Sequence, residues 1–392
     1  ALIRGQQTGA AVVLGSATPS LESYQNSLQG KYVYLSLPER IEARPLPEVK
    51  IVPFSKEAPH HFLTPLLQQA IQIRLEAKEQ TLLFLNRRGF APFILCPECG
   101  EVPRCAHCSV SLTLHKRRGV LLCHYCGLAL PPPTRCGHCR GTRLKEMGMG
   151  TERLEDHLKA SFPDARILRM DRDTTQRKRA HHEILKAAAE GEIDILIGTQ
   201  MIAKGHDLHG VTLVGILCAD MGLHLPDFRA AERTFQLLVQ VAGRAGRGRQ
   251  PGEVIVQTYH PGHYTLRYAQ QHDVLGFYRE ELSHRKEGPY PPFCRLTVLR
   301  LNSKDEGAVE ERSKLLAAEI KRRIGFLGGG KIEMIGPASC PIERLRGEYR
   351  WQILLRGTSN RQIGKLLGEI LPAQRRSRSV KIELDIDPQS LL

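Results

Sequence analysis

The sequence lacks several segments that would place it in a familiar class of protein. No apolar run approaches the roughly 20 residues that a membrane-spanning helix needs. Residues 1–9 do not show the charged and then apolar layout of a secretory signal, so we expect a cytoplasmic protein with no membrane partner. No complete G-x-x-x-x-G-K-(S/T) phosphate loop and no Asp-Glu-x-His segment occur. The nearest match, in residues 325–331, is followed by Ile332 where Mg²⁺ binding needs a hydroxyl group, and we interpret it as a glycine-rich turn.

Negative charge is also scarce in this chain. The 392 residues contain 56 lysines and arginines against 41 aspartates and glutamates, which gives a net charge of +15 and a pI near 9.4. Such a bias favours a polyanionic partner, because each phosphate that is neutralised releases counterions. Charge alone does not distinguish DNA from RNA. The length and the 41% hydrophobic content are enough for about two to four well-packed domains.

Cysteine is clustered rather than spread along the chain. Eight of the 11 cysteines lie in four C-x-x-C pairs: Cys96 and Cys99, Cys105 and Cys108, Cys123 and Cys126, and Cys136 and Cys139. Each pair offers two thiolates at the spacing that suits tetrahedral zinc, and eight thiolates complete two sites without an open position for catalysis. We therefore predict two structural zinc ions rather than a disulfide framework or a hydrolytic centre.

Spacing alone does not decide how the four pairs share two ions. The inner two pairs form C-x2-C-x14-C-x2-C, which is close to the zinc-ribbon pattern. We favour a nested arrangement over an interleaved one, with one ion on Cys96, Cys99, Cys136 and Cys139 and the other on Cys105, Cys108, Cys123 and Cys126. We expect His107, His124 and His138 to be surface groups rather than ligands. Because roughly 40 residues cannot bury a core unaided, zinc would make this lobe a rigid carrier of basic side chains: Arg104, Lys116, Arg117, Arg118 and Arg135.

Apolar runs alternate with helical patterns through most of the chain, which is typical of an α/β fold. In residues 1–37 the pattern predicts strands at 11–14 and 32–35 and a helix from Ser20. Prolines at positions 38, 45, 47 and 53 indicate a linker. Thr64 is a candidate N-cap, with Pro65 at the first helical position. A parallel, doubly wound sheet then follows, with strands expected at 81–85, 167–170, 194–198, 212–218 and 254–257.

The last part of the chain follows a different order. After a helical stretch to residue 286, the pattern is βαββαβ, with strands at 295–301, 331–335, 349–356 and 380–387 and helices at 306–324 and 360–371. This order predicts a separate α+β domain with a ferredoxin-like split unit. It is rich in arginine: Arg322, Arg323, Arg344, Arg346, Arg350, Arg375, Arg376 and Arg378. We favour binding of nucleic acid or protein over a merely solvated basic face.

The most informative segment has the sequence QVAGRAGR and begins at Gln240. Positions three apart on a helix share one face, so Arg244 and Arg247 can reach the same anion. Guanidinium groups are planar, bidentate donors that suit phosphate oxygens and the charge that develops in phosphoryl transfer. The alternative is that these arginines lie at the solvent-exposed, basic end of a helix and bind no phosphate.

A second polar segment directly follows the strand expected at 194–198. Ligands of open α/β sheets collect at the carboxyl ends of the strands. We therefore expect a nucleotide or a backbone phosphate to meet Thr199, Gln200, Lys204 and Asp207.

These segments resemble three motifs of superfamily 2 helicases in order and spacing. Gly15-Ser16-Ala17-Thr18 resembles motif III, residues 199–207 resemble motif V, and residues 240–247 resemble motif VI. The resemblance is narrowed to the PriA (primosomal protein N′) family of bacterial replication-restart helicases by three features: the sequence GTQMIAKGHD, the cysteine-rich insertion, and the sequence GPYPPF at 288–293. The resemblance covers essentially the whole chain. It implies the end of a first RecA-like, P-loop NTPase-type lobe in 1–37, a second such lobe in 38–95 and 142–259, a zinc-binding insertion in 96–141 and a DNA- or protein-binding domain in 260–392.

The resemblance also implies roles for individual residues. ATP and Mg²⁺ would be the cofactors, and the residues that act on the nucleotide would be Gly205, Asp207, Gln240, Arg244 and Arg247. Among them Arg247 would be the arginine finger and Gln240 the nucleotide sensor. Ser16 and Thr18 would couple hydrolysis to lobe movement. The backbone phosphates of DNA would be held by Arg87, Arg88, Thr199, Gln200 and Lys204.

The implied activity is ATP-dependent 3′ to 5′ DNA unwinding at forks, D-loops and single-stranded DNA, followed by primosome assembly for replication restart. The implied partners are single-stranded DNA-binding protein, other primosome proteins and the loader of the replicative helicase. Because the phosphate loop and the Walker B acid are absent, the chain would start inside the first motor lobe, and we expect these residues alone to hydrolyse no ATP. Two alternatives stay open: a zinc-dependent nucleic-acid-binding scaffold or loader without catalysis, and an RNA helicase or RNA-modifying factor.

Overall fold

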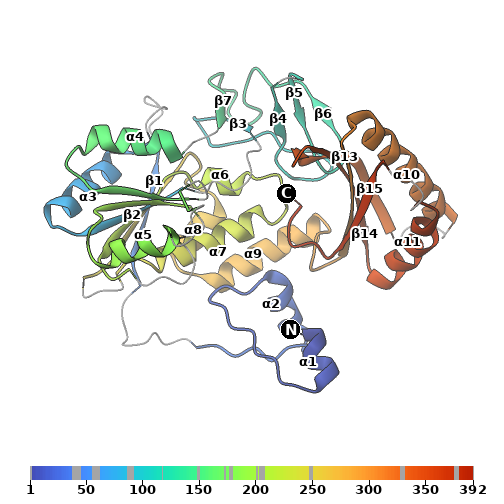
Figure 1. Cartoon of the computed structure of the whole chain (residues 1–392), viewed down its shortest axis with the longest axis horizontal. Coiled ribbons are helices and arrows are strands. Elements are labelled where there is room, and N and C mark those ends of the chain that lie inside the picture. The colour runs from blue at the N-terminus through green and yellow to red at the C-terminus, as the bar shows by residue number, and fades with distance from the viewer. Residues whose placement is uncertain are drawn as a thin grey trace. The chain divides into compact units, whose positions relative to one another are not determined.

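Figure 1 shows the computed structural model of the chain, which describes all residues except 1, 38–45, 55–61, 86–91, 117, 148–150, 172–173, 176–179, 200–201, 203–207, 247–249, 327–331, 375–378 and 392. The chain forms two compact units, Ala1–Arg44 and Pro45–Leu392. Each unit is described separately below.

The first unit contains two helices, α1 (Leu2–Thr8) and α2 (Leu21–Leu28). Ser20 caps α2 by accepting a hydrogen bond from the backbone N–H of Ser23, so the predicted helix start is confirmed. The strands predicted at 11–14 and 32–35 are wrong, and the side chains of Val13 and Val33 are 89% and 86% exposed. Strands of a parallel sheet need neighbours to bury their faces, and the described residues of this unit contain no strand.

A six-stranded parallel sheet forms the centre of a lobe in the second unit, which we call the sheet lobe. Its strands are β1 (Glu48–Pro53), β2 (Gln80–Phe84), β8 (Ile167–Met170), β9 (Ile195–Gly198), β10 (Val211–Ile216) and β11 (Glu253–Thr258), in the order β1-β11-β10-β2-β9-β8. All neighbours are parallel, as the alternating pattern predicted. Pro53 ends β1 and does not belong to the predicted linker; β1 is an edge strand, where proline is tolerated.

Helices cover both faces of this sheet (Figure 1). α3 (Pro65–Glu76) begins where the sequence predicted, with the Thr64 hydroxyl accepting from the Leu67 N–H. Together with α4 (Thr151–Ser161), it packs on the face that carries Leu83. α7 (Ala230–Ala242) lies on the opposite face, where Leu238 and Phe84 line a small cavity. Two shorter helices complete the lobe: α5 (Ala180–Ala189) and α6 (Asp220–Leu223).

The cysteine-rich insertion leaves and rejoins the sheet lobe at one place. β3 (Phe93–Leu95) and β7 (Lys145–Met147) pair antiparallel and form its neck. Beyond the neck, β4 (Thr113–His115), β5 (Val120–Leu122) and β6 (Ala129–Leu130) form a small antiparallel sheet.

The C-terminal domain follows α8 (Tyr264–Gln270) and α9 (Val274–Glu287). Its elements are β12 (Arg295–Ser303), α10 (Glu306–Phe326), β13 (Ile332–Leu345), β14 (Glu348–Gly357), α11 (Asn360–Gln374) and β15 (Lys381–Ile386). The strands are antiparallel in the order β13-β14-β12-β15, so the predicted βαββαβ unit is confirmed. α10 and α11 cover one face of this sheet, where Leu299 and Leu301 are buried.

The cysteine-rich insertion covers the other face of the C-terminal sheet. Leu296, Val298 and Leu354 lie in one core with Leu121 and Tyr125 of the insertion. Successive residues of a strand point to opposite faces of the sheet. One set of β12 side chains therefore packs against the helices, and the other set packs against the insertion. In Figure 1 the strands β4 and β5 accordingly lie beside β13. Residues 96–141 and 260–392 therefore share a hydrophobic core.

Candidate functional site

The four C-x-x-C pairs fold as four copies of one turn. In each copy, the residue four positions after the first cysteine has a positive φ and donates its backbone N–H to the carbonyl of that cysteine. These residues are Gly100 (φ 76°), Ser109 (φ 55°), Gly127 (φ 81°) and Arg140 (φ 64°). The N–H of each first cysteine donates in turn to the carbonyl five positions further on. The turns therefore hold the two sulfurs of each pair in a fixed relation.

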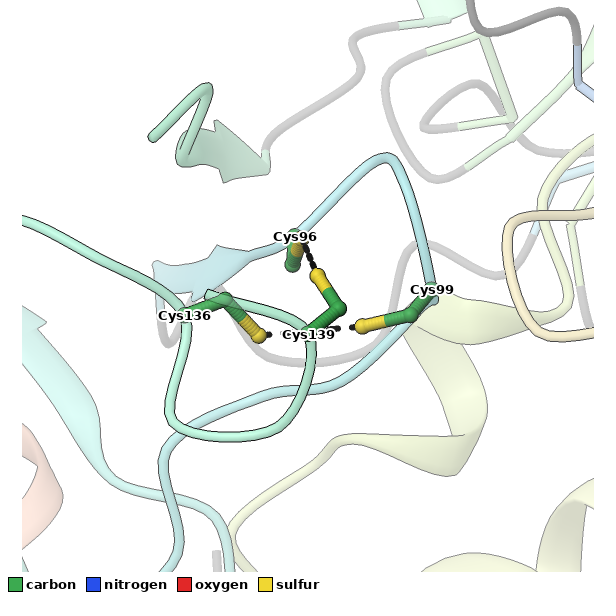
Figure 2. Close-up of side chains that lie close together, drawn as sticks. All are labelled: Cys96, Cys99, Cys136 and Cys139. Carbon is green, nitrogen blue, oxygen red and sulfur yellow. Dashed lines mark hydrogen bonds between the residues drawn. The ribbon is translucent and has the colours of Figure 1, made fainter. Parts of the chain in front are cut away.

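The turns meet in two groups of four cysteines. In the outer group, Figure 2 shows the thiols of Cys96, Cys99, Cys136 and Cys139 pointing toward one another. The Sγ–Sγ distances are 3.5 Å for Cys96 and Cys139 and 3.7 Å for Cys99 and Cys136. In the inner group, Cys105 and Cys126 are 3.6 Å apart, and the ligand atoms of each group all lie within 4.8 Å of one another. The grouping is nested and not interleaved.

Both groups fit a tetrahedral zinc ion. Four sulfurs at about 2.3 Å from one ion lie about 3.8 Å apart, close to the distances above. Four thiolates fill the tetrahedron, so each group would hold a structural ion and offer it no open position for catalysis. In the inner group the hydrogen bond from the Cys108 thiol lowers the pKa of Cys123 to about 5 against the opposing effect of burial. This lowering favours the thiolate form of Cys123, which is the form that binds a metal cation.

One of the three histidines in the turns is not a surface group. His107 and His138 are exposed, as expected, but His124 is fully buried, and that prediction is wrong. Its Nδ1 lies 2.9 Å from the Ser339 carbonyl of β13 and its Nε2 lies 3.2 Å from the Nε2 of His115. Burial lowers the pKa of His124 to about 4. His124 therefore fastens the insertion to the C-terminal sheet, a role that depends on a contact more than 200 residues away.

The two cysteine groups have different neighbours. The outer group lies against the sheet lobe: a Cβ on Gly100 would come within 2.5 Å of the Cβ of His260 and 2.7 Å of the Tyr259 carbonyl. The inner group belongs to the core shared with the C-terminal domain, because Cys105, Cys108 and Cys123 are members of that core. Loss of one ion or the other should therefore disturb different parts of the protein.

Several of the basic side chains proposed to meet nucleic acid are in ion pairs. Lys116 lies 2.7 Å from Glu146, and Arg118 lies 3.4 Å from Glu306. Arg322 and Arg323 both pair with Glu319. Arg104, Arg135, Arg344 and Arg346 are exposed, and Arg350 is half-buried. Arg117, Arg375, Arg376 and Arg378 lie outside the described residues.

The motif residues lie at two opposite edges of the parallel sheet. Thr199 directly follows β9, at the carboxyl edge. Leu208, at the far end of the motif V loop, accepts the N–H of Val211 at the amino end of β10. The described residues at the two ends of this loop, Thr199 and Leu208, thus lie at opposite edges of the sheet, and the expectation that Thr199 and Asp207 meet one ligand stays a prediction. Gln200, Lys204, Gly205 and Asp207 lie outside the described residues, as do Arg87 and Arg88.

The helix that carries Gln240 ends earlier than the motif VI pattern predicted. α7 stops at Ala242, so Arg244 lies in the following turn and not on a helical face. The N–H of Gly246 donates to the Val211 carbonyl at 3.2 Å, which places this turn at the amino edge beside the end of the motif V loop. Arg244 is 8% exposed and Gln240 is exposed. Arg247 lies outside the described residues.

In the first unit, the two hydroxyl residues proposed to couple hydrolysis to movement are close to each other. The backbone N–H of Thr18 donates to the Ser16 Oγ at 3.1 Å. Thr18 is buried and Ser16 is exposed.

Sequence reasoning missed the buried polar groups of the sheet lobe. Asp220 is fully buried at the carboxyl edge, where it accepts from the Thr258 hydroxyl and the Tyr259 N–H, both at 3.0 Å. Burial raises the pKa of Asp220, and these hydrogen bonds oppose that effect. A second buried group joins Glu232 of α7 to Arg285 of α9 at 2.8 Å. No spacing in the sequence marks such groups, since each depends on contacts between distant elements.

Among the helices of the described residues, none has both the length and the apolar content to cross a bilayer.

Three family models match parts of this chain. The helicase conserved C-terminal domain matches residues 143–249, which include β8 to β10 and α7. The PriA DNA helicase Cys-rich region domain matches residues 105–131, which include the inner cysteine group. The primosomal protein N C-terminal domain matches residues 286–389.

Curated relatives match along the whole chain. Replication restart protein PriA of Bacillus subtilis (strain 168) is 41% identical over 398 residues, which cover 100% of this chain and 49% of that protein. The proteins of the same name from Haemophilus influenzae and Treponema pallidum are 39% and 40% identical over 100% of this chain and over 53% and 59% of their own lengths. The chain thus spans about half the length of the curated relatives it matches. With the three family matches, this similarity shows that the chain belongs to the PriA family of replication restart proteins.

Proposed function

We propose that this chain supplies the second motor lobe, the zinc module and the C-terminal binding domain of an ATP-dependent DNA helicase that restarts replication. One observation carries the proposal: the Gly246 to Val211 hydrogen bond brings the turn that holds Arg244 beside the end of the motif V loop. These are the two segments that family resemblance assigns to the nucleotide. In a RecA-like lobe, these two segments would lie together at one edge of the parallel sheet and face a nucleotide that another lobe holds.

The nucleotide would be ATP with Mg²⁺, bound between this lobe and a lobe that carries the phosphate loop. Gly205 and Asp207 would contact the nucleotide, and Gln240 would sense it. Arg244 and Arg247 would donate to the γ-phosphate oxygens, with Arg247 as the arginine finger. Ser16 and Thr18 would couple hydrolysis to movement of the lobes.

DNA would lie at the carboxyl edge of the sheet and on the basic surfaces. Thr199, Gln200, Lys204, Arg87 and Arg88 would hold backbone phosphates. Because phosphate contacts carry no base identity, recognition would depend on the shape of a fork or D-loop. The net charge of +15 supports such binding.

The biological setting is the cytoplasm. The partners would be single-stranded DNA-binding protein, other primosome proteins and the loader of the replicative helicase, with 3′ to 5′ movement along one strand.

The test is ATP hydrolysis with and without forked DNA, in this chain joined to a first motor lobe that supplies the missing motifs. We expect DNA-stimulated turnover that falls by roughly 10³-fold or more in Arg247→Ala, with little change in Arg166→Ala, a surface arginine beside β9 that pairs with Asp194. The unjoined chain should hydrolyse no ATP. Forked-DNA binding without turnover in the joined protein would favour the zinc-dependent scaffold, and preference for structured RNA would favour the RNA-directed alternative.

A further inference from the structure

The loop in front of α7 contains a buried carboxylate with an unusual set of donors. Asp227 is 3% exposed. Its Oδ1 accepts the backbone N–H of Arg229 at 2.9 Å, and its Oδ2 accepts Arg233 Nη1 at 2.7 Å and the backbone N–H of Leu391 at 3.3 Å. Asp227 is not the N-cap of α7, which is Arg229, and the side chain of Arg229 makes no capping hydrogen bond. This carboxylate instead joins the first turns of α7 to the end of the chain.

The end of the chain is held at several points around Asp227. Arg229 Nη1 donates to the Pro388 carbonyl at 3.0 Å, and Arg233 Nη2 donates to the Gln389 carbonyl. The neighbouring Ser390 carbonyl accepts Arg300 Nη2 of β12 at 2.9 Å. The segment 388–391, which we call the tail, therefore bridges the C-terminal sheet and the first turns of α7.

The insertion reaches the same loop through Phe228. The Phe228 ring stacks on Tyr290 with a centroid distance of 4.7 Å and an interplanar angle of 4°, and its N–H donates to the Tyr125 hydroxyl at 3.2 Å. The Tyr290 hydroxyl donates to the Cys108 carbonyl of the inner cysteine group at 2.8 Å. Residues 227–229, which we call the hub, thus contact the sheet lobe, the insertion and the C-terminal domain.

α7 connects the hub to the other edge of the sheet. The helix follows the carboxyl end of β10 and precedes the amino end of β11, so it runs from the edge of Thr199 to the edge of Arg244. At 1.5 Å per residue, the ten steps from Ala230 to Gln240 span roughly 15 Å as one rigid segment. α7 is therefore one continuous element between the hub and Gln240.

We propose that Asp227 is a positioning residue through which the tail and the insertion set α7, and with it Gln240 and Arg244. This inference rests on the proposed motor function. DNA held by the insertion and the C-terminal domain would act on nucleotide turnover through the hub, because both of these parts contact α7 there. Without Asp227 or the tail, α7 still packs on the sheet but loses its hydrogen-bonded connection to the parts proposed to bind DNA.

The first test uses the chain itself. Asp227→Asn and a truncation after Asp387 are compared by amide hydrogen exchange of residues 234–246, with Asp194→Asn as the matched control, since it removes a carboxylate that pairs with Arg166 at 2.6 Å on the same lobe. We expect exchange at the end of α7 to rise roughly tenfold in both variants and to be unchanged in the control. The two changes combined should have less effect than the sum of their separate effects, because both disturb the hydrogen bond between Asp227 and Leu391. Unchanged exchange in both variants, or fully additive effects, would overturn the proposal.

The second test separates positioning from simple loss of stability. In the joined protein, we expect the DNA-stimulated rate to fall roughly tenfold in Asp227→Asn, while the DNA-free rate and the affinity for forked DNA stay within about twofold. An equal fall in both rates would show a merely structural residue and would contradict the inference. Absence of turnover in the unmodified joined protein would instead refute the proposed function, and the exchange experiment would still decide whether the tail and Asp227 position α7.

Discussion

Replacement of Arg285 by methionine should destabilise the sheet lobe strongly and in a pH-dependent way. Arg285 is 2% exposed and lies 2.8 Å from Glu232 and 2.7 Å from Glu281, which are each 3% exposed. Burial lowers the pKa of Arg285, but the two carboxylates outweigh that effect and raise it. Methionine retains much of the apolar volume and removes the charge, so the variant would keep two carboxylates buried without their cation.

The magnitude follows from the burial of these carboxylates. Removing one partner of a buried ion pair costs about 3–5 kcal/mol, a large part of the roughly 5–15 kcal/mol that stabilises a typical domain. The matched control is Arg267→Met, because Arg267 pairs with Glu280 at 2.9 Å where the two side chains are 53% and 31% exposed. Such an exposed pair contributes about 1 kcal/mol or less.

The pH dependence distinguishes buried charge from lost packing. Burial already raises the pKa of Glu281, with Arg285 opposing it. Without Arg285, the folded-state pKa of Glu281 should rise further above the unfolded value of about 4.3. The folded state then binds more protons than the unfolded state, so the variant is least stable above the raised pKa of Glu281 and recovers stability as the pH falls toward 5.

The assay is urea unfolding followed by far-ultraviolet circular dichroism at pH 8, 6.5 and 5. We expect the difference between Arg285→Met and the unmodified chain to be largest at pH 8. A loss that equals that of Arg267→Met, or that is the same at all three pH values, would refute the reasoning from buried charge.

Two further predictions concern the zinc centres and His263. Mass spectrometry should find two zinc ions on the chain. Serine at Cys105 and Cys108 should remove one ion and shift the urea transition of Trp351 fluorescence to a lower urea concentration, and serine at Cys136 and Cys139 should remove the other ion and shift this transition less. Equal shifts would contradict the different neighbours of the two groups. Burial lowers the pKa of His263 to about 3, so the unfolded state takes up a proton first and the stability of the fold should decline as the pH falls from about 6.5 toward 3, by on the order of a few kcal/mol. His263→Asn keeps an acceptor for the Thr265 N–H at the start of α8 and does not titrate, so its decline over this range, measured by urea midpoints, should be shallower.

The local signals of the sequence were sufficient for most elements of the second unit. Thr64 and Pro65 marked the start of α3 because the cap depends on four neighbouring residues. The strand 195–198 follows from a short apolar run that is buried in the sheet, and the strand 167–170 pairs beside it at the edge of the sheet. The cysteine spacing indicated two zinc groups, since each turn is local and repeats four times.

The same reasoning failed where the outcome depends on distant partners. Val13 and Val33 lie in runs with strand composition, but no strand among the described residues of their unit can pair with them. His124 follows a ligand cysteine in an otherwise polar turn, and only the C-terminal sheet buries it. Asp227 looks like an ordinary loop residue, since its partner Leu391 is 164 positions away. Contacts of this kind leave no periodic pattern in a single sequence.

The shared core gives the insertion a second role besides carrying charge. Helices cover one face of the C-terminal sheet, so Leu296, Val298, Ile335 and Leu354 on the other face depend on the insertion for burial. At about 1.5–3 kcal/mol for each buried side chain, this face contributes on the order of 6–12 kcal/mol, comparable with the net stability of a domain. The insertion cannot bury a core unaided at its length of roughly 40 residues. Each part therefore stabilises the other, and because Cys105, Cys108 and Cys123 belong to this core, an ion in the inner group also stabilises β12 and β14.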